Sequence, residues 1–316
     1  MRELVGFKKG VDLGGWLSQC DYSQERLDHF VEEKDLAKVA SWGVDHVRLP
    51  FDFNIVQAED DSFIEDGFER IAKAIGWAKK YGLKIVLDLH KTKGFSFDAA
   101  HGESGFFESE KLQEGFYALW EEMAKRFGND TENVAFELLN EITDQSFIGE
   151  WNRISTECIK RIRVYAPDVL ILLGSYWNNS PDAVKDLAAP ADDKVIFNMH
   201  CYDPLKFTHQ GAYWTDMIVK EERYSFDEMN LDVNYFKERF KSAVETAEKY
   251  NTALYCGEYG VIDVVSPEDA LKWYKTIHAA FEELGIGRSA WNYKEMDFGL
   301  SDERMSGVIE ELIKYL

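Results

Sequence analysis

Residues 68–90 read FERIAKAIGWAKKYGLKIVLDLH, and the two halves of this stretch predict the fold. The first half carries apolar residues at helical spacing, namely Phe68, Ile71, Ala72, Ile75 and Ala78. The second half, Lys84–His90, is a nearly continuous apolar run, which is typical of a parallel strand covered on both faces. A helix followed at once by such a strand indicates an α/β protein.

The same alternation of helix and strand runs along the whole chain. Strands are predicted at Gly10–Trp16, His46–Phe51, Lys84–His90, Val134–Asn140, Leu170–Ser175, Val195–Tyr202, Thr252–Glu258 and Arg288–Tyr293. Eight such units favour a (β/α)8 TIM barrel over a doubly wound sheet. No linker-like segment divides the chain, so we expect one domain over residues 1–316. Elongated loops are predicted after the third and sixth strands, at Lys91–Glu110 and Asp203–Tyr235.

Composition and charge exclude several classes of protein. The chain has 316 residues, with 36 Lys and Arg against 58 Asp and Glu, and its net charge of −22 argues against nucleic acid or an anionic membrane as a partner. The longest apolar run, Val169–Leu173, is far too short to span a bilayer. The N-terminus lacks the apolar core of a signal peptide, and the four cysteines form no CxxC pair. We therefore expect a cytoplasmic monomer with reduced thiols, or a secreted protein if a leader has been removed.

Polar and aromatic side chains stand where six of the predicted strands end. The motifs are HVRLPF (46–51), LDLH (87–90), FELLNE (136–141), NMHCY (198–202), CGEYG (256–260) and WNYK (291–294). The candidate site residues in them are Arg48, His90, Asn140, Glu141, His200, Tyr202, Glu258 and Trp291. A parallel barrel brings the carboxyl ends of its strands to one opening, so these side chains are predicted to meet there. Glu137 is expected to face away from Asn140, in a buried and paired structural role.

Two glutamates at one barrel mouth suit glycoside hydrolysis. One carboxyl group must be protonated to supply the leaving oxygen, and the other must be ionised to attack the anomeric carbon. Glu141 and Glu258 are the candidates, and Arg48 and Tyr202 are predicted to keep Glu258 ionised. Taken singly, Glu141 could be a helix N-terminal carboxylate and Glu258 a solvated loop residue. Their occurrence together at two strand ends favours the catalytic pair.

The ordered set of motifs resembles glycoside hydrolase family 5, the cellulase family, from Gly10 to about Phe298. The opening GVDLGGW also resembles the start of bacterial cellulases and of 1,3-glucanase relatives. Two positions depart from the family pattern. Lys91 stands where many cellulases have a second histidine, and Ile142 stands where a proline often follows the acid/base. Neither departure touches the two glutamates, but both bear on the linkage that the enzyme prefers.

The eight residues at the strand ends match the eight that this family places around its first sugar subsite. The resemblance implies that Glu141 is the acid/base and Glu258 the nucleophile. The other roles that it implies are support of Glu258 by Arg48 and Tyr202, tuning of Glu141 by His200, binding of sugar hydroxyls by Asn140 and His90, and stacking of the sugar on Trp291. It also implies a cis peptide bond between Trp291 and Asn292.

Further aromatic residues are candidates for sugar contacts. Trp177 and Asn178 follow the predicted strand Leu170–Ser175 and are candidates for lining a sugar subsite. Trp177 is predicted to bind substrate, with a packed loop tryptophan as the alternative. Tyr213 and Trp214 lie in the sixth loop. They are interpreted as a platform on the leaving-group side, with a small loop core as the alternative.

No cofactor and no metal ion is expected. The letters GIGRSA at 285–290 fit a dinucleotide-binding motif, but they follow a predicted helix and precede a predicted strand, which is the reverse of the required order. The sequence has no P-loop, no Gly-x-Ser-x-Gly elbow and neither His-x-His nor His-Glu-x-x-His. A metal-dependent barrel hydrolase would therefore lack its usual ligands.

The leading interpretation is a retaining glycoside hydrolase that cleaves β-1,4 or mixed β-1,3/1,4 glucans, or cello-oligosaccharides, by double displacement. Its expected partner is thus a β-glucan or an oligosaccharide. An exo-β-glucosidase, a 1,3-glucanase or a β-mannanase could use the same site. A non-catalytic sugar-binding barrel is the alternative from a different class, and the presence of both glutamates argues against it.

Overall fold

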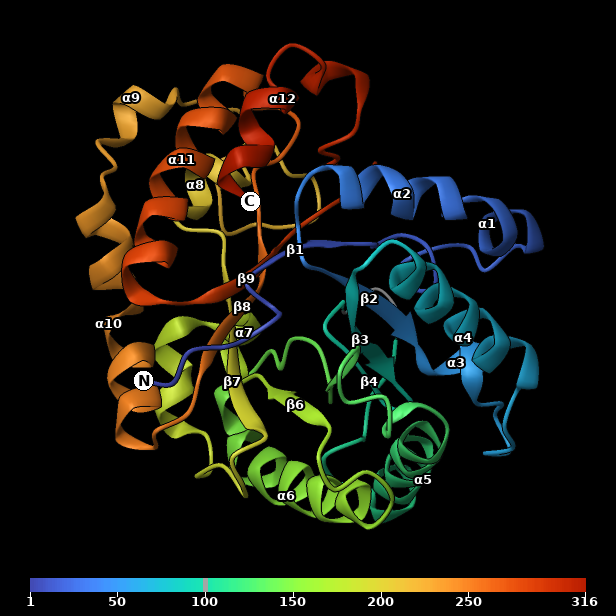
Figure 1. The fold of residues 1–316 in the computed structure, drawn as a ribbon. Coiled ribbons are helices and arrows are strands. Elements are labelled where there is room, and N and C mark those ends of the chain that lie inside the picture. The colour runs from blue at the N-terminus through green and yellow to red at the C-terminus, as the bar shows by residue number, and fades with distance from the viewer. Residues whose placement is uncertain (99–101) are drawn as a thin grey trace.

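Eight parallel strands form a closed barrel at the centre of the molecule, as predicted (Figure 1). The computed structural model describes residues 1–98 and 102–316, so residues 99–101 of the third loop lie outside the described range. The barrel strands are β1 (Lys9–Asp12), β2 (His46–Asp52), β3 (Lys84–Thr92), β5 (Val134–Glu137), β6 (Leu170–Leu173), β7 (Val195–Cys201), β8 (Leu254–Tyr259) and β9 (Gly287–Ala290). They are ordered β2-β1-β9-β8-β7-β6-β5-β3, and pairing of β2 with β3 closes the barrel. The short β4 (Phe95–Ser96) pairs antiparallel with the end of β3.

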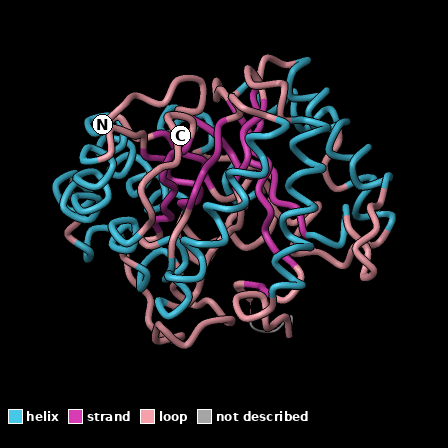
Figure 2. The backbone as a smooth tube through the Cα atoms, turned by 90° about the horizontal axis from the view of Figure 1, so that it is seen from below, coloured by secondary structure: helices cyan, strands magenta, loops and turns pink. Residues whose placement is uncertain are grey.

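Helices surround the barrel, and the view from below shows the strands gathered between them (Figure 2). The longer helices are α2 (Glu33–Ser41), α4 (Glu65–Lys80), α5 (Glu110–Phe127), α6 (Ile148–Tyr165), α10 (Val233–Lys249) and α11 (Pro267–Leu284). The shorter ones are α1 (Gln24–His29), α3 (Phe53–Val56), α7 (Tyr176–Asn179), α8 (Leu205–Thr208), α9 (Phe226–Met229) and α12 (Ile309–Leu312). Among the residues described, no helix combines the length and the apolar character that crossing a membrane requires.

The apolar stripe predicted for α4 packs on the barrel, except that Ala72 is exposed and Ala74 is buried in its place.

Helix α10 follows the long loop after β7, and it begins at Val233, earlier than predicted. It begins there because the Asp232 side chain caps the helix by accepting a hydrogen bond from the Tyr235 backbone N–H. The loop before it holds α8 and α9, so this long connection at the barrel mouth has structure of its own.

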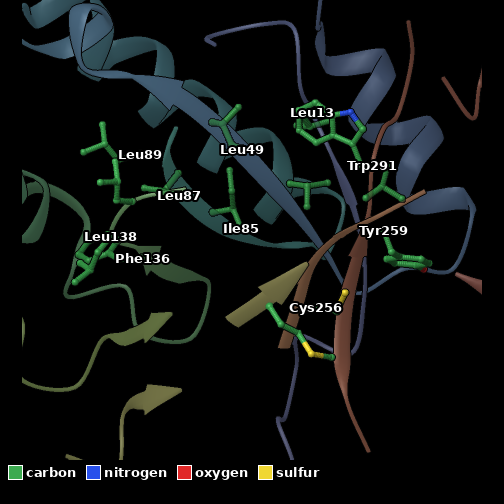
Figure 3. Packing of buried hydrophobic residues seen from close by; sticks show 14 of the residues in the cluster. Leu13, Leu49, Ile85, Leu87, Leu89, Phe136, Leu138, Cys256, Tyr259 and Trp291 are labelled. Atoms are coloured by element: carbon green, nitrogen blue, oxygen red, sulfur yellow. The ribbon is translucent and has the colours of Figure 1, made fainter. Parts of the chain in front are cut away.

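Alternation along the strands sorts their side chains into two layers. The outward row of β3 packs against the helices beside Leu49 of β2 and Phe136 of β5 (Figure 3). That outward row is Ile85, Leu87 and Leu89, and the inward row is Val86, Asp88 and His90. Val86 joins a small apolar cluster that fills the barrel at the amino-terminal ends of the strands, away from the mouth. The other members of this cluster are Leu4, Phe7, Ala135, Leu172, Ile196, Ala253 and Tyr255. The barrel interior is therefore apolar at its base and charged toward its mouth.

Five strands end earlier than predicted. They are β1, β5, β6, β7 and β9, which end at Asp12, Glu137, Leu173, Cys201 and Ala290. The predicted strand residues beyond these ends are buried, except that Tyr202 is half-buried. Burial alone therefore does not mark the end of a ladder, because a segment can be covered without being hydrogen-bonded to a neighbouring strand. All four cysteines are free.

Candidate active site

Arg48 lies at the centre of a buried group of carboxylates in the barrel interior. Its Nε donates to Glu137 Oε2 at 2.7 Å and its Nη1 to Glu258 Oε1 at 2.8 Å. Its Nη2 lies 2.9 Å from Asp88 Oδ2, and Asp12 Oδ2 lies 3.6 Å from Nη1. Burial acts to lower the pKa of Arg48, but the four acids raise that pKa well above its ordinary value. The guanidinium is thus a permanent cation below the barrel mouth.

A β-bulge in β8 turns Glu258 toward the mouth. The register between β7 and β8 shifts, so that His200 lies opposite Glu258 and Gly257 has no partner of its own. A Cβ atom on Gly257 would lie only 2.8 Å from Asn198 Oδ1, so this close approach requires glycine. The extra residue breaks the inward–outward alternation and places the Glu258 carboxylate among the inward side chains.

The surroundings of Glu258 favour its ionised form. Tyr202 Oη donates to Glu258 Oε2 at 2.9 Å, and His200 Nδ1 lies 3.6 Å from the same oxygen. Burial acts to raise the pKa of Glu258, but His200, Arg48, His90 and the Tyr202 hydrogen bond together lower that pKa to about 2. Glu258 is 5% exposed and carries a negative charge at neutral pH, as a nucleophile must.

Glu141 stands directly beside Glu258 and is 8% exposed. Its Oε1 lies 2.8 Å from His200 Nδ1, and its Oε2 accepts a hydrogen bond of 2.7 Å from Asn178 Nδ2. One oxygen from each glutamate and a nitrogen of His200 lie within 4.8 Å of one another. Among the described residues, these three form the one group of His, Cys, Asp or Glu side chains that lie close enough together to share a metal ion.

His90 and Trp291 form a wall of the site. His90 Nδ1 lies 2.6 Å from Asp88 Oδ2, and the His90 ring stacks on the Trp291 ring at 5.8 Å with an interplanar angle of 5°. The Trp291–Asn292 peptide bond is cis, as predicted. Gly14 packs against the indole, since a Cβ there would lie 2.5 Å from the Trp291 ring.

Asn140 reaches the same centre from the segment after β5. Its Oδ1 accepts a hydrogen bond of 2.9 Å from Arg48 Nη2, and its Nδ2 lies 3.4 Å from His90 Nε2. Glu137 is buried and paired, as predicted. The prediction that it faces away from Asn140 is wrong, because both side chains contact Arg48. The reason is that β5 ends at Glu137, and strict alternation does not extend past the ladder.

The structure thus brings together the eight residues predicted at the strand ends, whereas Trp177 stands apart at the rim. Trp177 is 53% exposed and adjoins Asn178, which contacts Glu141. Tyr213 and Trp214 are also exposed. Trp214 contacts the ring of His209, and His209 contacts Tyr202 edge-on. These aromatic residues lie on the side of the mouth formed by the loops after β6 and β7.

Three groups of this centre are not predicted from the sequence in the roles that the structure shows. Asp12 and Asp88 belong to the charges around Arg48. Asn178, which is predicted only as a candidate for lining a subsite, contacts Glu141. The place of Asp88 in the site is predictable in principle. It precedes His90 by two residues, and side chains two residues apart in a strand lie on the same face of the sheet. The contact of Asn178 with Glu141 is not predictable, because it depends on a turn that no spacing predicts.

A buried ionised glutamate, a second glutamate beside it and a stacked tryptophan at the mouth of a (β/α)8 barrel are the parts of a glycoside hydrolase. The chain matches the family model described as Cellulase (glycosyl hydrolase family 5) over residues 12–297. It therefore belongs to glycosyl hydrolase family 5, as the resemblance of its motifs implied.

Relatives agree with this assignment, and solved structures share the fold. The chain is 61% identical to cellodextrinase A of Ruminococcus flavefaciens over 283 residues, which cover 90% of this chain and 84% of that protein. It is 37% identical to endoglucanase C of Acetivibrio thermocellus, with 99% of this chain and 98% of that protein covered. A solved endoglucanase structure shares the fold at a TM-score of 0.84 and 22% identity, covering 98% of this chain and 97% of that one. The cellulose synthase subunit Z of Clostridioides difficile has a TM-score of 0.83 at 25% identity, covering 97% of this chain and 99% of that one.

Proposed function

We propose that this chain is a retaining β-glucanase that hydrolyses β-1,4 or mixed β-1,3/1,4 glucans and prefers cello-oligosaccharides. The placement of Glu141 and Glu258 carries the proposal. Retaining enzymes hold their two carboxyl groups about 5–5.5 Å apart, whereas inverting enzymes need about 6.5–9.5 Å to admit a water molecule. One oxygen of Glu141 lies within 4.8 Å of one oxygen of Glu258, and this close approach supports the retaining arrangement.

In the first step, Glu258 attacks the anomeric carbon of a sugar that rests on Trp291. The bond from this carbon to the leaving oxygen breaks, and Glu141 gives its proton to that oxygen. The leaving sugar departs with a free hydroxyl group, and an ester joins the remaining sugar to Glu258. Asn140 Oδ1 is held by Arg48, so its amide nitrogen is the group left to donate to the sugar 2-hydroxyl.

In the second step, Glu141 is ionised and takes a proton from water. The water oxygen attacks the anomeric carbon, the ester bond to Glu258 breaks, and Glu258 regains its negative charge. Two inversions give a product with the β configuration of the substrate. NMR of the first-formed product should therefore show the β anomer, and the α anomer would overturn the assignment of Glu258.

The substrate preference rests on the relatives. The cellodextrinase at 61% identity supports cellodextrins, which are short β-1,4-linked chains of glucose, and the endoglucanase at 37% identity supports a glucan substrate. A panel of cello-oligosaccharides, carboxymethylcellulose, lichenan, laminarin and mannan tests this, with product sizes resolved. The highest kcat/KM is expected on a cello-oligosaccharide. A higher value on laminarin or mannan would instead establish a 1,3-glucanase or a mannanase, and no hydrolysis of any substrate would leave a sugar-binding barrel.

The cluster of Glu141, His200 and Glu258 permits a direct test of metal dependence. Two carboxylates and an imidazole are ligand types that hydrolytic metal sites use. Under the proposed mechanism, dialysis against EDTA leaves kcat and KM unchanged, because each glutamate already has an assigned role as acid/base or nucleophile. A loss of activity that added Zn²⁺ restores would contradict the two-carboxylate mechanism.

Replacement of Trp177 by alanine should weaken binding of longer oligosaccharides. Its exposed ring lies beside the Asn178–Glu141 contact, on the side where the leaving sugar must bind. An aromatic contact contributes about 0.5–1.5 kcal/mol beyond buried area, so KM for cellopentaose should rise about 2- to 12-fold at nearly unchanged kcat. An aryl β-cellobioside, which has no sugar on the leaving side, serves as the matched control. Equal loss on both substrates would place Trp177 outside the subsite.

Replacement of Tyr202 by phenylalanine should move the acid limb of kcat/KM to higher pH. Glu258 must be ionised to attack, and the Tyr202 hydrogen bond is one of the interactions that lower its pKa to about 2. Without this donor the pKa of Glu258 rises, so activity is lost at a higher pH as acid is added. A hydrogen bond to a charged group contributes about 1.5–3 kcal/mol, which predicts a roughly 10- to 100-fold loss in kcat/KM.

The control for Tyr202→Phe is Tyr274→Phe in α11. The Tyr274 hydroxyl is buried and has no hydrogen-bond partner among the described residues. Its removal should leave the pH profile unchanged. An acid limb that stays in place in Tyr202→Phe would show that this hydrogen bond does not govern the ionisation of Glu258.

A further inference from the structure

One left-handed turn after β6 reaches the centre of the active site. Trp177, Asn178 and Asn179 follow each other with φ values of 50°, 55° and 56°. Asparagine tolerates this conformation far better than most residues, because its short polar side chain forms local hydrogen bonds. The Asn178 backbone N–H donates to Ile142 O at 2.9 Å, which ties the turn to the residue after Glu141.

The turn contacts one oxygen of the Glu141 carboxylate directly and reaches the other oxygen through His200. Asn178 Nδ2 donates directly to Oε2 at 2.7 Å. Asn179 Nδ2 lies 3.2 Å from His200 Nε2, so the second asparagine of the turn contacts the far side of the His200 ring. His200 Nδ1 in turn lies 2.8 Å from Glu141 Oε1. Two adjacent asparagines therefore orient the carboxylate, one directly and one through the imidazole.

We propose that Asn178 is a positioning residue for the acid/base Glu141; the inference rests on the proposed function. Each carboxylate oxygen has two acceptor sites, so the hydrogen bond from Asn178 leaves one site on Oε2 free to hold the transferred proton. The hydrogen bond fixes the plane of the carboxylate and the direction of that site. It also stabilises the ionised form of Glu141, which takes the proton from water in the second step.

Two variants separate the amide from the turn that carries it. In Asn178→Gly the side chain is absent, and glycine adopts the left-handed conformation without a steric penalty. In Asn178→Asp the shape and the tolerance of this conformation remain, but the donor is replaced by a negative charge beside Glu141. Asn251→Gly is the matched control, because Asn251 is an exposed left-handed residue (φ 49°) that precedes β8, at the opposite end of the barrel.

The test compares phenyl β-cellobioside, whose leaving group needs a proton, with 2,4-dinitrophenyl β-cellobioside, whose leaving group does not. In Asn178→Gly, kcat/KM on the phenyl substrate should fall about 10- to 100-fold, the loss expected for one hydrogen bond to a charged group. On the dinitrophenyl substrate it should change less than about threefold, since proton donation is not needed there. The alkaline limb of kcat/KM on the phenyl substrate should move to higher pH, and further in Asn178→Asp, because the ionised carboxylate is destabilised.

Equal losses on the two substrates, or an unchanged alkaline limb, would overturn the role of Asn178. If Asn178→Gly does not fold, the pH profile of Asn178→Asp decides alone. Glu141→Ala is measured in parallel. If Glu141→Ala shows no dependence on the leaving group, the proposed mechanism itself fails. If Glu141→Ala shows that dependence and the Asn178 variants do not, only the positioning role is lost.

Discussion

Replacement of Glu258 by alanine should abolish hydrolysis of every substrate, with a fall in kcat of roughly 10⁵- to 10⁶-fold, as expected when a catalytic nucleophile is removed. No other carboxylate can take its place. Glu137 and Asp88 lie deeper in the barrel and are bound to Arg48, and Glu141 is held by His200 and Asn178. The measurement is steady-state kinetics on 2,4-dinitrophenyl β-cellobioside, with Glu258→Gln as a second variant of nearly unchanged shape.

Glu141→Ala is the matched comparison for this prediction. It should lose much less activity on the dinitrophenyl substrate than on a glucan, because the activated leaving group departs without a proton. Added azide should occupy the space left by the carboxylate and form a β-glycosyl azide, which restores part of the rate. Activity above about one percent of the wild type in Glu258→Ala would contradict its assignment as the nucleophile.

Replacement of Arg48 by methionine should cause the largest loss of stability. Methionine carries no charge, so the four acids that share the Arg48 cation would stay buried without it. These acids are Asp12, Asp88, Glu137 and Glu258. Removal of one partner from a buried ion pair costs about 3–5 kcal/mol, so the free energy of unfolding at pH 7 should fall by at least about that amount. Urea denaturation measures it. Arg153→Met is the control, because Arg153 and its partner Glu150 are both half exposed, and a surface ion pair contributes about 0–1 kcal/mol.

The stability difference between Arg48→Met and the wild type should narrow as the pH falls. In the wild type the pKa of Glu258 lies at about 2, below its ordinary value of 4.5. Its ionisation therefore stabilises the fold above pH 4.5, and this contribution is lost as the pH falls from 4.5 toward 2. In the variant the pKa of Glu258 rises, so protonation relieves the uncompensated charge at a higher pH. A difference in stability that does not depend on pH would show that Arg48 acts through packing alone.

The architecture of the barrel and the residues at its mouth follow from the amino-acid sequence alone. Alternating helical and strand-like stretches predict the barrel, because a parallel strand must be covered by helices and its pattern of burial appears directly in the residues. The polar residues at the strand ends predict the meeting of Arg48, His90, Glu141 and Glu258, because closing a barrel brings all the carboxyl ends together. Both predictions, the barrel and the meeting of the strand-end residues, depend only on the order of helices and strands along the chain and not on exact distances.

The directions of several of these side chains depend on contacts that form in the folded barrel. Glu258 faces the site because Gly257 is an extra residue in β8, and an alternation count cannot reveal a bulge. Glu137 and Asn140 both reach Arg48 because β5 ends between them.

The turn at 177–179 places the Asn178 amide on Glu141 through three consecutive left-handed residues, and no spacing in the sequence predicts that conformation. Side-chain type and chain order are local properties that a sequence states directly. The direction of a side chain at the end of a strand depends on bulges and turns, and these are set by the close approach of segments far apart in the chain.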